Sequence, residues 1–347
     1  MKKYYGIELL RFFCSLSIVI YHWGTSFFYL NLKDNYPYKF LFNWIYANGN
    51  YAVSVFFVIS GLVFSNIYLQ QNDRTSFINF FIKRFARLYP LHILTLFLII
   101  IIQFLFLKIF GSYQLYTFND FYHFLLNISF VLGWDLEVGN SFNSPVWTVG
   151  LEIVIYFFFF FLITSINRYK IPLILFVYVI FLLFDKTKVS ELPYIKKFIT
   201  FEYFIDFVRL FFSGVFIFLI EQKYKNSKYL LPVTVVFLIY AFIGNFKLYL
   251  FCPSLVLLFV LIDNLTVSDK LKNAFQFLGN LTYSMYLFHT VTFLFSLFIL
   301  KLFNKMDLFY SDLFFIFYLL LTVGISLCSF NYYEKILNRK IRENFLK

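Results

Sequence analysis

The sequence predicts an all-α, polytopic integral membrane protein with about ten transmembrane helices and both termini in the cytoplasm. Three observations support this fold class. The 347 residues are 61% hydrophobic with a mean hydropathy of +0.76, and only 14% are charged, whereas soluble domains are about half apolar and about a quarter charged. Apolar runs long enough to span a bilayer recur along the chain. Basic residues concentrate in alternate loops between these runs.

The predicted spans follow one another from the first residues onward. A hydrocarbon core about 30 Å thick needs about 20 helical residues, or fewer where the flanking side chains snorkel. No small-residue cleavage site follows the first run, so we expect a retained span and not a signal peptide. The stretch FYHFLLNISFVLGW, residues 121–134, is short, and its alternatives are an interfacial, a re-entrant or a spanning segment. The ten predicted spans are 8–30, 51–70, 88–110, 145–167, 171–185, 203–221, 229–244, 248–262, 279–301 and 309–331.

Charge asymmetry sets the predicted orientation. With the N-terminus in the cytoplasm, the inner segments carry 18 of the 30 Lys and Arg residues. Counting 121–134 as a span would invert all later segments and place the basic C-terminus outside, so the positive-inside rule favours ten spans. The net charge of +12 then indicates contact with anionic lipids and no nucleic-acid partner. The inner segments are 1–7, 71–87, 168–170, 222–228, 263–278 and 332–347.

We expect one domain without a metal site. The cysteines Cys14, Cys252 and Cys328 lie in apolar runs without metal-ligand spacing, so neither a zinc site nor a disulfide framework is predicted. No Gly/Ser-rich or Pro-rich linker interrupts the chain, and the tail after residue 331 is too short to fold alone. Residues 1–347 are therefore expected to form a single membrane domain with no fused extracytoplasmic domain.

The first span, IELLRFFCSLSIVIYHW, carries polar residues along one side. Arg11 and His22 have ten residues between them, which places both on one helix face ~16 Å apart along the axis. Glu8 and Ser15 fall close to the same stripe. Arg11 by itself would serve as a snorkelling anchor of the topology, but that role does not explain His22. Ionisable residues inside spans usually face a cavity, so this stripe is a candidate functional site.

Further candidates lie in later spans. Glu152 is in the outer third of its span beside Trp147, which either stacks on a sugar or belongs to the aromatic belt, the belt being the simpler role. Asp206 and Arg209 are three residues apart, so they either neutralise each other or line a pocket. His289, in YSMYLFHT, either forms hydrogen bonds between helices or contributes to the site.

A basic cluster precedes the third predicted span. In FIKRFARLYP, Arg84 and Arg87 are three residues apart on one side of a helix, with Lys83 beside them. Positive residues are common in any inner loop, which is one explanation of this cluster. The other is a phosphate-binding fork, because two guanidinium groups at helical spacing can grip a diphosphate with paired hydrogen bonds.

Taken together, the motifs resemble a known family. In order, they are LLRFFCSLSIVIYHW, FFVISGLVF, KRFARLYP, SPVWTVGLEIVIYF, LGNLTYSMYLFH and NYYEKI, and they extend from residue 6 to about residue 335. Each motif alone is weak, but their order and spacing match the acyltransferase 3 family of membrane acyltransferases.

The resemblance identifies functional positions in this chain. The family's hallmarks are an Arg and a His in the first span, and an Arg pair separated by two residues. These correspond here to Arg11, His22, Arg84 and Arg87. The sequence departs from the family at TVGLEI, where many relatives have two adjacent acids and this chain keeps only Glu152.

The family resemblance implies transfer of an acyl group, most often acetyl, from acyl-CoA to a hydroxyl group of an extracytoplasmic glycan. The acceptor would be a lipid-linked sugar or a surface glycan such as capsule or lipopolysaccharide, and the enzyme would lie in the bacterial cytoplasmic membrane. Acyl-CoA is cytosolic and its phosphates need cations at the inner face, which Lys83, Arg84, Arg87 and Arg11 would supply.

The expected chemistry uses the stripe on the first span. Glu8, Arg11 and Ser15 would line a polar path for the thioester, and His22 would be the general base that deprotonates the acceptor hydroxyl. Glu152 would orient His22, as the acid of a catalytic triad does. A covalent acyl-histidine intermediate is the alternative to direct transfer.

Other classes of membrane protein fit the sequence less well. A secondary transporter or a lipid-linked-sugar flippase would have a similar number of spans, but it would usually show internal repeats with broken helices, and no such repeat is visible. A glycan polymerase would have a larger outer loop than residues 111–144. A purely structural protein would not need Arg11 and His22 on one face.

Overall fold

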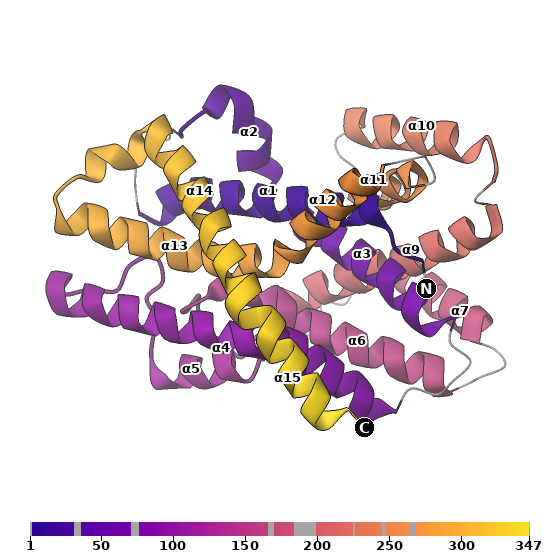
Figure 1. Cartoon of the computed structure of the whole chain (residues 1–347), viewed down its shortest axis with the longest axis horizontal. Helices are drawn as coiled ribbons and strands as arrows, with labels where there is room; N and C mark the ends of the chain where they lie inside the picture. The colour runs from indigo at the N-terminus through magenta and orange to yellow at the C-terminus, as the bar shows by residue number, and fades with distance from the viewer. Residues whose placement is uncertain are drawn as a thin grey trace. The chain divides into compact units, whose positions relative to one another are not determined.

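The computed structural model describes residues 2–30, 36–70, 76–165, 170–183, 199–224, 226–244, 248–263 and 268–346. Within these ranges the chain forms helices, short 3₁₀ turns and loops, and contains no strand (Figure 1). Parts of several predicted loops and span ends lie outside the described residues, namely 31–35, 71–75, 166–169, 184–198 and 264–267.

Seven described helical stretches are long and apolar enough to cross a membrane, and all seven fall on predicted spans. They are α1 (Tyr5–Tyr29), α3 (Tyr51–Tyr68), α4 (Phe77–Phe110), α6 (Trp147–Ser165), α9 (Ile199–Tyr224), α13 (Thr282–Leu302) and α14 (Asp312–Ser329). The last of these continues through a π-turn, η3 (Phe330–Glu334), into α15 (Lys335–Phe345). The predicted all-helical membrane fold is therefore confirmed.

The other three predicted spans fall on shorter apolar helices, α7 (Lys170–Leu183), α10 (Leu230–Ile243) and α11 (Leu248–Ile262). The short stretch 121–134 contains only α5 (Phe121–Ile128), whose eight residues extend about 12 Å and cannot cross a bilayer. The remaining elements are α2 (Lys39–Asn48), α12 (Asp269–Asn280) and the 3₁₀ turns η1 (Ser144–Val146) and η2 (Met306–Tyr310).

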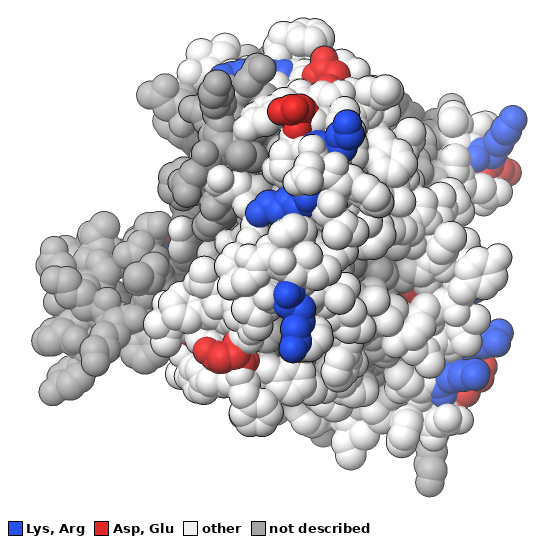
Figure 2. All heavy atoms as spheres, turned by 90° about the vertical axis from the view of Figure 1, so that its left-hand side faces the viewer, with Lys and Arg blue, Asp and Glu red and all other residues white. Residues whose placement is uncertain are grey.

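The surface of these helices suits a lipid environment. On α4, Phe97, Ile101 and Phe104 recur at helical spacing and are exposed, while Leu96 and Ile99 on the other side are fully buried. A large apolar helix face that is exposed in a membrane protein is one that lipid covers. On the face seen in Figure 2, charged residues are few and scattered among uncharged ones.

The chain divides into two compact units, each built from segments far apart in the sequence. The first comprises Met1–Cys14, Tyr51–Arg74 and Val149–Gly279. Within it, α3 and α9 pack against each other and approach closely at two glycines. A Cβ atom on Gly61 would lie 1.8 Å from the carbonyl oxygen of Phe211, and one on Gly214 would lie 1.9 Å from that of Val58. Small residues allow membrane helices to pack backbone against backbone in this way.

The second unit comprises Ser15–Asn50, Thr75–Thr148 and Asn280–Lys347. Helix α13 is buried along most of its length and packs against α4 and α14, while α15 lies along α4. Pro90 interrupts the hydrogen-bond ladder inside α4, and the nearby carbonyl of Leu88 accepts a hydrogen bond from the Tyr283 hydroxyl at 2.6 Å. This hydrogen bond joins α13 to α4 next to the proline.

Candidate active site

Two histidines from distant parts of the sequence meet in the second unit. The imidazole of His22 on α1 stacks on that of His289 on α13, with ring centroids 4.9 Å apart and planes inclined by 27°. His289 is fully buried, whereas His22 is partly exposed. The structure thus brings together the first-span histidine and the only other histidine that the sequence placed inside a candidate site.

Hydrogen bonds distinguish the two rings. His289 Nδ1 lies 2.6 Å from the carbonyl oxygen of Tyr286 and so acts as a donor, while its Nε2 lies 3.3 Å from the Thr290 hydroxyl. This pattern assigns the tautomer of His289, with the proton on Nδ1. Among the described residues, no hydrogen bond engages the ring nitrogens of His22. The imidazole of His22 is therefore the one whose nitrogens are available to a substrate.

Packing next to His22 holds this part of α1 in place. Trp23 is fully buried, and its ring centroid lies 4.5 Å from that of Phe309 and 4.6 Å from that of Tyr318. Large aromatic side chains of this kind contribute much of the packing energy of a core. Because Trp23 directly follows His22, its burial fixes the backbone from which the catalytic candidate projects.

The segment SPVWT docks on α13 beside His289. The Thr148 hydroxyl donates to the Tyr286 hydroxyl at 2.6 Å, and the Tyr286 hydroxyl donates to the Pro145 carbonyl. The Asn143 amide donates to the Leu287 carbonyl at 3.2 Å. Two of the family-like motifs, SPVWTVG and LTYSMYLFH, therefore contact each other directly. Trp147 in this segment is partly exposed, and its choice between sugar stacking and the aromatic belt stays a prediction.

The remaining polar residues of α1 have partners within their own units. In the first unit, Arg11 Nη1 lies 2.9 Å from Glu8 Oε2, and both side chains are partly exposed. Glu8 also contacts Gly279, where a Cβ atom would lie 2.0 Å from Glu8 Oε2. In the second unit, Ser15 is buried and donates to the Thr282 carbonyl at 3.2 Å. Whether these three residues line a path for the thioester stays a prediction.

Glu152 belongs to a polar cluster in the first unit. Its Oε1 accepts hydrogen bonds from the Ser60 hydroxyl at 2.7 Å and from the Tyr156 hydroxyl, and the two hydroxyl oxygens are 3.1 Å apart. This cluster joins two of the sequence motifs, because Ser60 belongs to ISG and Glu152 belongs to TVGLEI. The predicted pairing of Glu152 with His22, which belongs to the other unit, stays a prediction.

Asp206 and Arg209 form the ion pair that was one of the two sequence-based alternatives. Arg209 Nη1 lies 3.5 Å from Asp206 Oδ1, and Arg209 Nε donates to the Phe181 carbonyl at 2.7 Å. The Tyr249 hydroxyl donates to Asp206. These contacts link α7, α9 and α11 within the first unit, which is a structural use of both charges.

The basic cluster lies near the start of α4. Lys83, Arg84 and Arg87 are all partly exposed, and the Arg84 guanidinium lies 5.9 Å from the centre of the Phe80 ring. Arg87 lines a cavity of about 300 Å³ whose other walls come from η3 and α15. The sequence leaves the cations of α4 as either ordinary inner-loop charges or a phosphate-binding fork, and it does not predict that α15 lies along α4.

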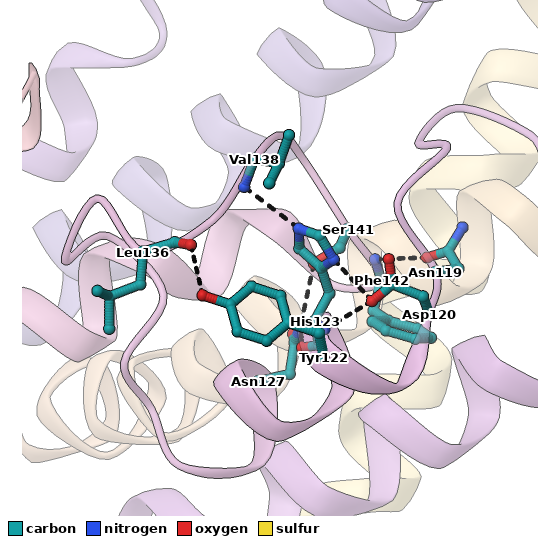
Figure 3. A network of polar contacts seen from close by, with 9 residues as sticks. All are labelled: Asn119, Asp120, Tyr122, His123, Asn127, Leu136, Val138, Ser141 and Phe142. Atoms are coloured by element: carbon teal, nitrogen blue, oxygen red, sulfur yellow. Dashed lines mark hydrogen bonds and ion pairs between the residues drawn. The ribbon is translucent and has the colours of Figure 1, made fainter. Parts of the chain in front are cut away.

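The loop around α5 contains a polar network that the sequence analysis missed (Figure 3). His123 is buried, and its Nδ1 lies 2.8 Å from Asp120 Oδ1, while its Nε2 accepts from the Val138 amide at 3.3 Å. Asp120 also accepts from the His123 backbone amide, and this hydrogen bond is the main cause that lowers the pKa of its carboxyl group. Since both ring nitrogens are used, His123 fastens the loop. The Asp-x-x-His spacing at a helix N-terminus was the available signal.

A second group missed from the sequence lies near the N-terminus in the first unit. Glu221 is buried, and its carboxylate contacts Lys2 Nζ at 2.8 Å and the Tyr4 hydroxyl at 3.4 Å. Burial and the nearby Glu221 carboxylate raise the pKa of Tyr4. The sequence analysis placed Glu221 at the end of a span and gave it no role. The burial of Glu221 depends on its ion pair with Lys2, and the positions of these two residues in the sequence do not reveal that contact.

The fold and these polar clusters define an integral membrane protein in which an imidazole pair lies between two helices. A comparison with family models identifies its family. The model of the acyltransferase 3 family, described as an acyltransferase domain, matches residues 4–330. The chain therefore belongs to the acyltransferase 3 family, and its enzyme class is acyltransferase. Comparisons with curated proteins and with solved structures gave no match.

Proposed function

We propose that the protein is a membrane O-acyltransferase of the bacterial cytoplasmic membrane. It moves an acyl group, with acetyl as the first candidate, from cytosolic acyl-CoA to a hydroxyl group of a cell-surface or lipid-linked glycan. The family match supports the class of reaction and gives no support to a transporter or flippase. The observation that carries the proposal is the stacked pair of His22 and His289, with only His289 committed to hydrogen bonds.

In the proposed mechanism His22 is the general base. It takes the proton from the acceptor hydroxyl as that oxygen attacks the thioester carbonyl, the carbon–sulfur bond breaks, and the proton passes to the departing CoA thiolate. The uncommitted ring nitrogens of His22 support this role, because a base must accept a proton from substrate and not from its own helix. His289, held by the Tyr286 carbonyl, presents a fixed ring face against which His22 is positioned.

The proposal requires a defined topology. Ten spans with both termini in the cytoplasm would place the start of α4 and all of α15 at the inner face, where acyl-CoA arrives. The loop that contains α5 would then be outside, on the side of the glycan acceptor. Arg11, Lys83, Arg84 and Arg87 are the proposed donor-binding cations, and anionic lipids are expected to contact the inner face.

Acyl transfer in isolated membranes tests the proposal. Membranes from cells that express the protein are incubated with radiolabelled acetyl-CoA, and the label in extracted glycans and lipid-linked sugars is measured, followed by mass spectrometry of the products. We expect label in a glycan fraction that is absent from membranes with His22→Asn protein at the same level. Equal labelling in membranes with and without the protein would refute the function, and labelling with a longer acyl-CoA only would replace acetyl by that group.

A further inference from the structure

A cavity with a strongly basic lining lies between α4 and the C-terminal helix, entirely within the second unit. Its volume is about 300 Å³. Arg87 contributes from α4, and the other lining residues come from the π-turn η3 and from α15. They are Phe330, Glu334, Lys335, Asn338, Arg339, Arg342 and Glu343.

The charges around this cavity do not cancel. Four cations face two carboxylates, and Glu334 is buried and already accepts a hydrogen bond from the Ser284 hydroxyl at 2.8 Å. Arg339 makes only a long, exposed contact with Glu343, at 3.9 Å. In the described part of the chain, no carboxylate lies within 4.0 Å of the charged groups of Arg87, Lys335 or Arg342. A cluster of cations around a cavity is an arrangement that an anion would stabilise.

The cations of α15 lie on one side of the helix. Lys335, Arg339 and Arg342 follow one another at spacings of four and three residues, which brings them to the same face. All the basic residues of α15 are exposed, and Lys340 differs from these three in that it does not line the cavity. The cavity-facing cations are thus a defined subset of the basic residues that the C-terminal segment carries.

The register of α15 against α4 is fixed by hydrogen bonds next to the cavity. The Tyr333 hydroxyl donates to the Pro90 carbonyl of α4 at 3.3 Å, and Glu334 is tied to Ser284 of α13. Both residues belong to η3, and single π-turns within helices occur frequently at functional sites. The positions of Lys335 and the residues after it therefore follow from contacts with α4 and α13.

We propose that Arg87 and the α15 residues Lys335, Arg339 and Arg342 bind the phosphate groups of the acyl-CoA nucleotide. This inference rests on the proposed function. The nucleotide end of CoA carries a diphosphate and a 3′-phosphate, and guanidinium groups bind such oxygens with paired, charge-assisted hydrogen bonds. A cavity of this volume accommodates the phosphate-bearing part of the molecule, with the pantetheine arm leading away. The C-terminal helix thereby becomes part of the donor site.

The test measures nucleotide binding by the full-length protein in lipid nanodiscs. Dissociation constants for CoA and for 3′-dephospho-CoA are determined by calorimetry in discs of phosphatidylcholine alone and in discs that also contain phosphatidylglycerol. The variants are the double substitution Arg339→Gln with Arg342→Gln, the single substitution Arg342→Lys, and the matched control Lys340→Gln.

We expect the double variant to weaken CoA binding by about tenfold to a hundredfold in neutral discs, because each charged hydrogen bond contributes on that scale. Lys340→Gln should change the dissociation constant by less than about twofold, since an exposed charge away from the ligand contributes little. Arg342→Lys keeps the charge and should give an intermediate loss, because an ammonium group cannot form the paired contact. Thermal unfolding of each variant checks folding, and Arg342→Lys decides the outcome if the double variant does not fold.

Two results would overturn the inference. One is CoA affinity that is unchanged in both cavity variants. The other is an effect seen only in discs with phosphatidylglycerol, which would make the cavity a lipid-headgroup site. If the unmodified protein itself fails to bind CoA, the proposed function fails; if it binds CoA and the α15 variants bind equally well, only this inference fails.

Discussion

The substitution His22→Asn separates a catalytic histidine from a packing residue. Asn has a polar side chain of comparable reach that keeps a hydrogen bond, but it cannot take up a proton near neutral pH. If His22 is the general base, turnover should fall by ~10²–10⁴, which corresponds to about 2.7–5.4 kcal/mol of transition-state stabilisation. If His22 only packs, most of the activity should remain.

The structure supplies a comparison variant in the stacked partner. His289 is buried against His22 and both of its ring nitrogens have partners, so His289→Asn should disturb the position of His22 without removing the base. Ring stacking contributes about 0.5–1.5 kcal/mol, which corresponds to a loss of turnover of about twofold to tenfold. The losses of turnover caused by the two substitutions should not add, because His289→Asn cannot misplace a base that His22→Asn has already removed.

The assay is acyl transfer at saturating acetyl-CoA with purified protein in nanodiscs, combined with CoA binding by calorimetry. The expected signature of His22→Asn is lost turnover with a CoA dissociation constant close to that of the unmodified protein. The proposed donor-binding cations lie on α4 and α15 and, in the case of Arg11, three turns away from His22 on α1. A His22→Asn protein that still acylates its acceptor at more than about a tenth of the normal rate would refute the assignment. The general base would then be sought at His289.

Three further predictions address donor binding, packing and topology. Replacing Arg84 and Arg87 together by Ala should raise the acyl-CoA dissociation constant about a hundredfold, and Lys at both positions should restore binding only partly; normal CoA binding with reduced acylation would instead indicate a folding role. Gly214→Ala should destabilise the protein by at least about 1–3 kcal/mol in thermal unfolding, because its Cβ would lie 1.9 Å from a carbonyl oxygen of α3, whereas Gly324→Ala, with no atom within 4 Å, should be neutral or stabilising. In a protein without its native cysteines, Phe345→Cys should react with an impermeant maleimide only after the cells are permeabilised; labelling of intact cells would contradict a cytoplasmic C-terminus.

The sequence predicts the helices of this fold well because the membrane leaves few alternatives. A backbone in hydrocarbon must satisfy its own hydrogen bonds, so a long apolar run without strand alternation becomes a helix. The span count was harder, since α7, α10 and α11 have only 14 or 15 residues and length alone does not decide whether they cross. In the stretch 121–134 the helix α5 ends at Ile128 and is too short to cross a bilayer, and the interfacial and re-entrant alternatives both stay predictions.

Local spacing places side chains that contact each other on single helices: it predicts the Asp206–Arg209 pair as one of two alternatives, and it predicts Glu8 and Arg11 on one stripe without predicting their ion pair. The contacts of Arg11 with Glu8 and of Arg209 with Asp206 both join residues three apart, as an α-helix requires. The contact of His22 with His289 could not be derived in this way, because it joins α1 to α13 and depends on how those helices pack. Hydropathy specifies that a residue is inside a span but not which neighbour it meets.

A count of charged residues in the sequence does not show which of them share a cavity. From the sequence alone, the basic residues of the C-terminal segment indicate only the topology, because positive residues are common at an inner face. The structure places α15 along α4, so three of those residues share a cavity with Arg87. A topology signal and a binding site use the same residue types, and only the position of a second helix distinguishes them.

Three of the motifs that resemble the family, KRFARLYP, LTYSMYLFH and NYYEKI, contact one another in the second unit although they lie far apart in the chain. Tyr283 of LTYSMYLFH and Tyr333 of NYYEKI donate to carbonyls of KRFARLYP on the two sides of the turn at Pro90. Ser284, next to Tyr283, donates to Glu334, next to Tyr333. Pro90 has no amide N–H to donate to the Ala86 carbonyl, four residues earlier. The two tyrosine hydroxyls donate to the neighbouring carbonyls of Leu88 and Pro90, and so join α13 and η3 to this part of α4. Because Arg87 lies one turn before Pro90, these contacts hold the part of α4 from which Arg87 lines the proposed donor site.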